Sequence, residues 1–328
     1  MNNSKFTSHC LADVKFNDDL NIVMCGNHIG GKEIIEFLLK NGVKFKYFVT
    51  IDKQTAIKNK VSGFYDYTAM AAKNNIPVYY CERFDLKSEK DIDFFKKNGF
   101  DLLVQGGWQR LFPQEVLDSL KIGALGTHGG ADFLPKYRGR SPLNWSLIEN
   151  KKRFIMQLFL MKSGADDGDI IDWFKFDINV FDDINTLYKK YAISIKYMIL
   201  RNINDLKNKN ASFKRQNGIP LYYPKRTNKD GQIDWENMYI DDIYNLVRAT
   251  SEPYPCAYSF IDEKIIKFIK VRVFDTSLLY LNASYGEIVE IFSDDTLLIN
   301  CLGGVLLIEK YKYDSDLRLG DKAIFSEV

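Results

Sequence analysis

The chain lacks several features that would indicate particular classes of protein. Its 328 residues carry 45 Lys and Arg against 43 Asp and Glu, which is not the composition of a strongly basic nucleic-acid binder. The five cysteines are scattered with no Cys-x-x-Cys spacing. This usage predicts neither a zinc site nor a disulfide framework, and it is typical of a reducing compartment.

Long hydrophobic runs are also absent from the sequence. No apolar segment approaches the ~20 residues that span a membrane, and residues 1–18 lack the apolar core of a signal peptide. We therefore expect a cytoplasmic protein with no membrane segment, in which residues 1–18 form an extension before the first strand.

The first half of the chain alternates short apolar segments with segments of helical spacing. "NIVMCG" (21–26) is followed by "GKEIIEFLLKNG" (31–42), and similar pairs continue as far as "RFIMQLFLMK" (153–162). Such repeats predict an α/β fold with a mostly parallel, twisted, Rossmann-like sheet and helices on both faces. Ligands of these sheets bind beyond the carboxyl ends of the strands.

The second half predicts a different, smaller domain. A long amphipathic helix at 184–206 closes a first domain at 19–205, and the polar, turn-rich segment 206–230 is interpreted as a linker. Residues 231–328 then contain one helix followed by several β-branched and aromatic strands. This pattern predicts a small β-barrel-like (OB-like) domain.

One segment, "GTHGGADFLPKYRGRSPLNW" (126–145), combines a rare histidine with residues that disfavour regular structure. His128 is one of only three histidines, and it follows the apolar "GALG" (123–126). Downstream, "SGADDGDII" (163–171) supplies Asp166 before another apolar segment. A carboxylate beside an imidazole suits general acid–base chemistry; the alternative is a solvated acidic turn, and a metal site is less favoured.

Three further motifs have both a functional and a structural interpretation. Arg138 and Arg140 flank a glycine and could present two guanidinium groups to a carboxylate or phosphate, or could simply be surface cations. "VQGGWQRLFPQE" (104–115) could bind a flat heterocycle or pack in the core. "CGNHIGGKE" (25–33) has the wrong glycine spacing for a dinucleotide fingerprint, so we expect a tight turn there that includes His28.

Taken together, these motifs resemble the 10-formyltetrahydrofolate-dependent formyltransferases. The matches are His128, "FLPKYRGRSPLNW" (133–145) and "GADDGDII" (164–171), with Asp166 at the family's catalytic aspartate. "DGQIDWENMYIDDIYNLVRATSEPYPCAYSF" (230–260) is similar to the second domain of the methionyl-tRNA and aminoarabinose formyltransferases. The resemblance implies that 19–205 is the catalytic domain.

The sequence departs from this family around His128. With a gap in the alignment, the family's catalytic Asn falls on Gly126 and the loop after His128 is longer than usual. Without a gap, the family's His would fall on Gly130. We adopt the gapped alignment because it keeps a titratable group at the centre of the chemistry.

In this family the Asn amide would stabilise the oxyanion, the negatively charged oxygen that forms when the amine attacks the formyl group. The departure leaves that oxyanion without this donor. Losing one such donor typically costs on the order of 10²–10³ in rate, so we expect a replacement. The candidates are the backbone of Gly129 or Gly130, Thr127, and Gln105.

The resemblance implies direct acyl transfer from 10-formyltetrahydrofolate to an amine, with no metal. His128 would take or relay the amine proton, and Asp166 would orient His128 and assist. The residues expected to bind the folate are Gln105, Gly107, Trp108, Arg110, Leu111 and Asp166.

Two molecules are candidates for the substrate that carries the amine. We favour a nucleotide-linked amino sugar, formylated for a surface polysaccharide such as lipopolysaccharide, with Lys136, Arg138 and Arg140 as substrate-binding cations. The alternative is methionyl initiator tRNA, which the second domain and the basic segment 213–229 favour but the balanced charge disfavours. A homodimer is left open.

Two other classes of function are also considered. One is a non-catalytic folate- or nucleotide-binding descendant, against which the retention of His128 and Asp166 argues. The other is a nicotinamide-dependent dehydrogenase, which rests only on the glycine turn at 25–33.

Overall fold

The computed structural model describes residues 20–326, so the predicted extension at 1–18 lies outside the described residues. The chain forms two compact units. The N-terminal unit comprises the described part of Met1–Gly139 with Ile155–Phe176 and Lys189–Tyr222; the C-terminal unit comprises Arg140–Phe154, Asp177–Tyr188 and the described part of Tyr223–Val328. A linker at 206–230 stays a prediction.

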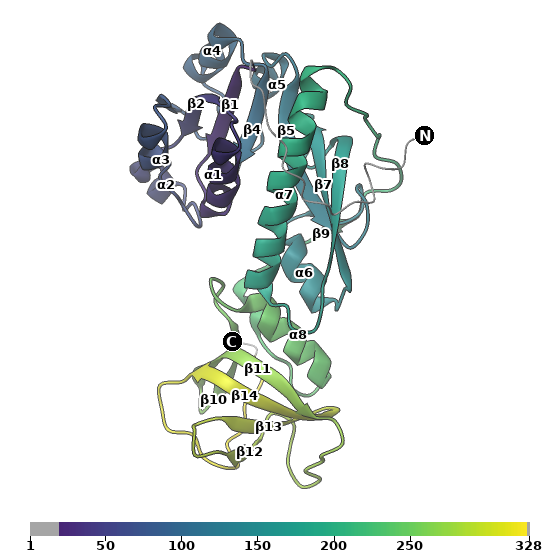
Figure 1. Cartoon of the computed structure of the whole chain (residues 1–328). Coiled ribbons are helices and arrows are strands. Elements are labelled where there is room, and N and C mark those ends of the chain that lie inside the picture. The colour runs from purple at the N-terminus through teal and green to yellow at the C-terminus, as the bar shows by residue number, and fades with distance from the viewer. Residues whose placement is uncertain (1–19, 327–328) are drawn as a thin grey trace. The chain divides into compact units, whose positions relative to one another are not determined.

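The N-terminal unit is built on a seven-stranded sheet with the order β3-β2-β1-β4-β5-β7-β8 (Figure 1). The first five strands pair in parallel, and β7 runs antiparallel to β5. The mostly parallel sheet predicted from the sequence is confirmed. The strands are β1 (Ile22–Gly26), β2 (Phe45–Thr50), β3 (Val78–Tyr80), β4 (Leu102–Gly106), β5 (Gly123–Gly130), β7 (Arg153–Met161) and β8 (Gly168–Asp177).

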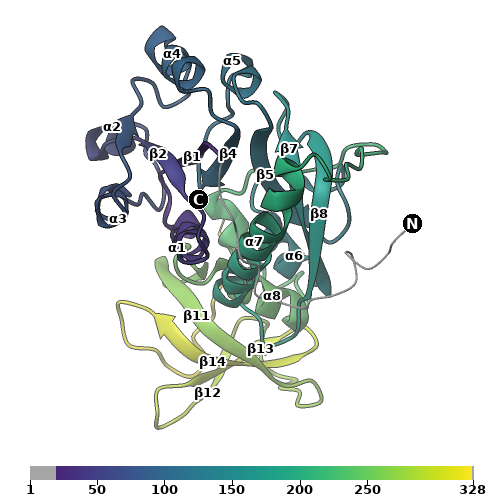
Figure 2. The same ribbon diagram turned by 45° about the horizontal axis from the view of Figure 1, so that its top comes forward.

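Helices cover both faces of this sheet, as expected. Val23 of β1 belongs to a buried cluster with Phe95 and Val116, whereas Gly106 of β4 faces Ile35 on the other side. Figure 2 shows α4 and α5 on one side of the sheet and α1 and α7 on the other. The helices are η2 (Ile29–Gly31), α1 (Lys32–Lys40), α2 (Lys53–Lys58), α3 (Thr68–Lys73), α4 (Glu89–Asn98), α5 (Gln114–Asp118) and α7 (Ile184–Lys207).

The long helix α7 confirms the helical pattern read at 184–206. Its Tyr197 packs against Phe37 of α1, with ring centroids 4.9 Å apart. No helix within residues 20–326 is long and apolar enough to cross a membrane.

The C-terminal unit contains a five-stranded antiparallel sheet with the order β10-β11-β14-β13-β12. Helix α8 buries its apolar face against this sheet, and Trp235 lies in the shared core, where its Nε1 donates to Ser259 Oγ at 2.9 Å. The smaller β domain expected after the catalytic one is therefore present. Its elements are α6 (Pro142–Ile148), η3 (Asn228–Gly231), α8 (Ile240–Thr250), β10 (Ala257–Ile261), β11 (Lys264–Asp275), β12 (Ile288–Ile291), β13 (Leu297–Cys301) and β14 (Gly304–Lys312).

Candidate active site

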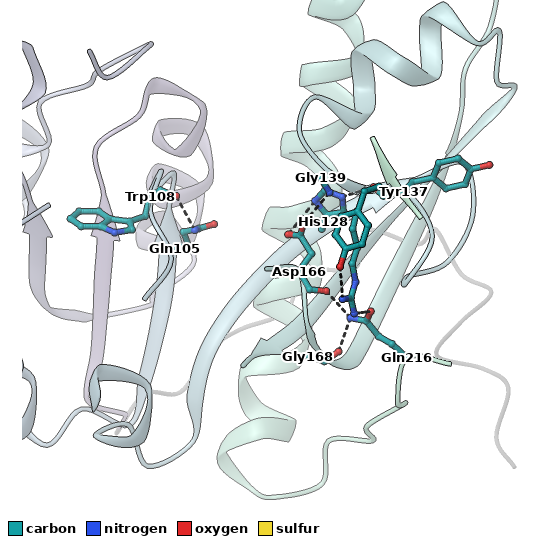
Figure 3. Close-up of polar contacts among 10 residues, drawn as sticks. Gln105, Trp108, His128, Tyr137, Gly139, Asp166, Gly168 and Gln216 are labelled. Atoms are coloured by element: carbon teal, nitrogen blue, oxygen red, sulfur yellow. Dashed lines mark hydrogen bonds and ion pairs between the residues drawn. The ribbon is translucent and has the colours of Figure 1, made fainter. Parts of the chain in front are cut away.

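His128 and Asp166 are brought together at the carboxyl end of β5. His128 lies near the end of β5, where it pairs with Gln157 of β7. Asp166 lies in the turn between β7 and β8. The imidazole Nδ1 is 3.4 Å from Asp166 Oδ1, and Nε2 is 2.8 Å from the carbonyl oxygen of Tyr137 (Figure 3). Both ring nitrogens thus face oxygen atoms, which fixes the orientation of the ring.

The two members of this pair differ in their access to solvent. The His128 side chain is 9% exposed and that of Asp166 24%. The Asp166 backbone has φ +51°, a left-handed conformation that few residues other than glycine adopt, and its Oδ2 accepts from the Gly139 backbone N–H at 3.4 Å. Asp166 is therefore the more accessible group of the pair.

The glycines beside His128 have no room for side chains. A Cβ at Gly130 would lie 2.5 Å from Cβ of Tyr137, and a Cβ at Gly126 would lie 2.4 Å from the Phe159 ring. Neither the family's His at 130 nor its Asn at 126 fits without displacing these neighbours. This crowding supports His128 as the titratable residue of the site.

Gln216 is a member of the site that the sequence did not reveal. Its Nε2 donates to the carbonyl oxygens of Asp166 and Gly168, at 2.9 Å each, and its Oε1 accepts from Arg138 Nη2 at 2.6 Å. It therefore holds the Asp166 turn in place (Figure 3). Gln216 lies in the polar segment 206–230, which has no periodicity that could have marked it.

The three predicted substrate-binding cations occupy different environments. Arg138 is only 8% exposed, and its guanidinium contacts Asp167 at 3.2 Å as well as Gln216. Lys136 is exposed and pairs with Asp132 at 2.9 Å. Arg140 is exposed and makes no ion pair within residues 20–326. The substrate role of each cation stays a prediction; in Arg138, Nη2 already binds Asp167 and Gln216.

The short β6 (Arg138–Gly139) explains why Arg138 is buried. It pairs with β9 (Tyr222–Tyr223), and the Arg138 backbone N–H donates to the Leu221 carbonyl at 2.9 Å. This pairing draws the cation inward against the segment that carries Gln216.

The predicted oxyanion donors are mostly engaged by the protein. Gly129 and Gly130 lie in strand β5, in register with β7, where a loop was expected. Gln105 Nε2 donates to the Trp108 carbonyl at 3.2 Å. Thr127 hydrogen-bonds Tyr191 of α7, which the sequence did not single out; burial raises the pKa of Tyr191, the Thr127 contact lowers it, and Asp166 raises it.

Most of the predicted folate-binding residues lie at the end of β4 or directly after it, whereas Asp166 lies in the turn between β7 and β8. Gly107 has φ +80°, and Trp108 is 5% exposed, packed against Phe84 with ring centroids 5.2 Å apart. The Arg110 guanidinium lies over the same Phe84 ring, 4.4 Å from its centroid. Leu111 is 59% exposed. Trp108 thus packs in the core, and Figure 3 shows Gln105 and Trp108 apart from the His128–Asp166 group.

His28 is a turn residue, in agreement with the structural interpretation of its motif. Its Nδ1 accepts from the Gly30 backbone N–H at 2.9 Å, and burial lowers its pKa. Gly26 and Gly31, at the two ends of this turn, pack against Gly106 at the end of β4.

Comparison with known families places the chain in one class of protein. A family model described as formyl transferase matches residues 20–202, and one described as formyl transferase, C-terminal domain, matches residues 225–322. The chain belongs to the formyltransferase family, and it is an enzyme of that class.

Similar proteins include a polymyxin resistance protein and methionyl-tRNA formyltransferases. The bifunctional polymyxin resistance protein ArnA of Wigglesworthia glossinidia brevipalpis is 30% identical over 284 residues; the match takes in 86% of this chain but only 41% of that longer protein. The methionyl-tRNA formyltransferase of Thermodesulfovibrio yellowstonii is 28% identical over 274 residues, covering 84% of this chain and 85% of the relative.

A solved structure shares the fold. The N-formyltransferase of Helicobacter canadensis, in complex with folinic acid and dTDP-3-aminofucose, matches with a TM-score of 0.63 and 19% identity, over 89% of this chain and 100% of that one. The folate bound there agrees with the folate co-substrate expected from the sequence.

Proposed function

We propose that this enzyme transfers the formyl group of 10-formyltetrahydrofolate to the amine of a nucleotide-linked amino sugar, for synthesis of a surface glycan. The observation that carries the proposal is the His128–Asp166 pair at the carboxyl edge of the sheet, where α/β folds bind ligands. Family membership supports the formyl transfer, and the dTDP-3-aminofucose of the Helicobacter canadensis enzyme supports the sugar.

The reaction needs one proton to move from the amine to the folate. The neutral amine attacks the formyl carbon, a new C–N bond forms, and the carbonyl oxygen gains negative charge. Collapse of this tetrahedral intermediate breaks the bond between the formyl carbon and folate N10, and N10 takes up a proton as it leaves.

We infer different roles in this transfer for the two groups. His128 takes or relays the amine proton, and Asp166, the more exposed member, lies 3.4 Å from His128 Nδ1, where it orients the imidazole and assists the proton transfer. The Tyr137 carbonyl anchors Nε2 at 2.8 Å and keeps the ring oriented. The oxyanion donor stays a prediction among Thr127, Gly129, Gly130 and Gln105.

Methionyl initiator tRNA is the second candidate substrate. It is supported by the methionyl-tRNA formyltransferase of Thermodesulfovibrio yellowstonii, which matches 84% of this chain. The balanced charge of the chain opposes it, because binding a phosphate backbone uses several Lys and Arg contacts.

One experiment separates these functions. The protein is given 10-formyltetrahydrofolate with a panel of nucleotide-linked amino sugars and, separately, with methionyl-tRNA, and each product is examined for the mass of one added formyl group. A formylated sugar supports the proposal, a formylated methionyl-tRNA replaces it with the second candidate, and no transfer even in a single turnover favours a non-catalytic descendant.

Asp166→Asn tests the assigned roles in the same assay. Its matched control is Asp169→Asn, because Asp169 lies three residues away, pairs with Lys162 at 3.1 Å and does not contact His128. We expect Asp166→Asn to lower turnover by about 10²–10⁴-fold and Asp169→Asn to leave it close to that of the unmodified enzyme.

A further inference from the structure

The C-terminal unit contains a cavity of about 510 Å³ that the formyl-transfer site does not use. It lies along α8 and β11, with walls from the turn after α6 and from the segment 180–181, and every lining residue belongs to the C-terminal unit. Figure 1 shows α8 lying against β11. The volume is in the usual range for small-molecule sites, ~300–1,000 Å³.

The lining of this cavity carries more positive than negative charge. Its four cations are Lys152, Arg248, Lys270 and Arg272, and its two carboxylates are Asp241 and Glu309. Glu309 serves two of the cations at once, at 3.1 Å from Lys270 and 3.0 Å from Arg272. The cavity therefore favours an anion.

Arg248 is the strongest sign of an anionic ligand. The residue is 7% exposed, with Nε donating to Asn245 Oδ1 and Nη1 to the carbonyls of Asn179 and Asp182, each at 2.9 Å. Its Nη2 makes no hydrogen bond within residues 20–326, and burial lowers the pKa of the guanidinium. The edge of the guanidinium that carries Nη2 is therefore available to an anion that enters the cavity.

Lys152 adds a second cation that lacks a carboxylate partner. Its Nζ contacts only Asn150 Oδ1, at 2.6 Å, among the described residues. Both groups donate several hydrogen bonds, which is what the oxygens of a phosphate require.

An aromatic ring stands beside these cations. Phe181 is 89% exposed, although its segment is fixed by the Arg248 contacts to Asn179 and Asp182 and by a hydrogen bond from the Tyr244 hydroxyl to the Val180 carbonyl. An exposed ring on a fixed backbone is a ready face for stacking a flat heterocycle.

We propose that this cavity binds a nucleoside phosphate, with the phosphates on Arg248, Lys152 and Arg272 and the base on Phe181. A free nucleotide fits better than a nucleic-acid strand. The carboxylates of Asp241 and Glu309 line the same cavity, and a strand is held by a continuous row of cations and repeated stacking faces. The site is independent of which amine the enzyme formylates.

The test is calorimetric titration of the full chain with uridine diphosphate, uridine and pyrophosphate. The variants are Phe181→Ala and Lys152→Ala. The controls are Phe292→Ala and Lys267→Ala, an exposed ring and an exposed cation of the same unit that do not line the cavity. Because the formyl-transfer site also binds nucleotide on the proposed function, the decisive result is sensitivity to the cavity variants and not the number of bound molecules.

We expect Phe181→Ala and Lys152→Ala each to weaken one uridine diphosphate site about tenfold, with the controls unchanged and formyl transfer retained. Uridine and pyrophosphate should each bind more weakly than the diphosphate. The proposal is overturned if neither cavity variant affects any site, or if pyrophosphate alone binds as tightly as uridine diphosphate. It is also overturned if a single-stranded RNA oligonucleotide binds more tightly than uridine diphosphate and loses that binding in Phe181→Ala.

Discussion

Gly130→Ala is a small change that should disturb the site through one identifiable contact. The added Cβ would lie 2.5 Å from Cβ of Tyr137, well inside van der Waals contact, so Tyr137 must move. Overpacking of this kind typically costs ~1–3 kcal/mol in the free energy of unfolding. The Tyr137 carbonyl anchors His128 Nε2 at 2.8 Å, and losing that hydrogen bond costs a further ~1 kcal/mol.

We expect the variant to be less stable by ~2–4 kcal/mol and to turn over about tenfold more slowly, since 1.36 kcal/mol corresponds to a factor of ten in rate. Urea denaturation gives the stability, and single-turnover formyl transfer gives the rate. Gly231→Ala is the control, because a Cβ there would come no closer than 3.3 Å to any atom outside its own neighbours.

A second substitution shows whether the clash is the cause. Tyr137 has φ +62°, a conformation that glycine adopts freely, so Tyr137→Gly removes the clashing side chain and keeps the carbonyl. In the double variant the loss caused by Gly130→Ala should largely disappear, with a coupling energy of about 1 kcal/mol or more. Strictly additive effects on stability and rate would refute the reasoning.

Three other predictions follow from single contacts. His128→Ala should leave folate binding, followed by tryptophan fluorescence, largely intact and should lower turnover by about 10²–10⁴-fold; unchanged turnover would contradict the assignment. Gln216→Ala should destabilise the protein in thermal unfolding by about 1–3 kcal/mol, because it leaves buried Arg138 with fewer partners; Gln216→Glu should recover little of the loss, because a carboxylate accepts from Arg138 but cannot donate to the Asp166 and Gly168 carbonyls. Burial raises the pKa of the Cys81 thiol to about 12, so alkylation of Cys81 at pH 8.5 should be on the order of a thousandfold slower in the native than in the urea-unfolded protein, by mass-spectrometric mapping; equal rates would disprove this.

The fold could be predicted from the local sequence pattern. Parallel strands are buried on both faces and are therefore continuously apolar, whereas the helices between them are buried on one face and are therefore amphipathic. The apolar segments of 21–26 and 153–162 and the helical spacing of 184–206 are each encoded within a short stretch of chain. The ends of strands were predicted less well. A loop was expected at Gly129 and Gly130, but both residues continue β5 because β7 pairs with them.

The sequence by itself determined which residues are the candidates for the chemistry, since His128 and Asp166 stand out by type and by motif. Only the tertiary structure decided how they meet: the turn between β7 and β8 brings Asp166 to Nδ1, and a backbone carbonyl, which no motif encodes, anchors Nε2. Gln216 and the cavity along α8 escaped prediction for the same reason. Each is made by segments distant in sequence, and hydrogen bonding and burial depend on which groups the fold brings together in space.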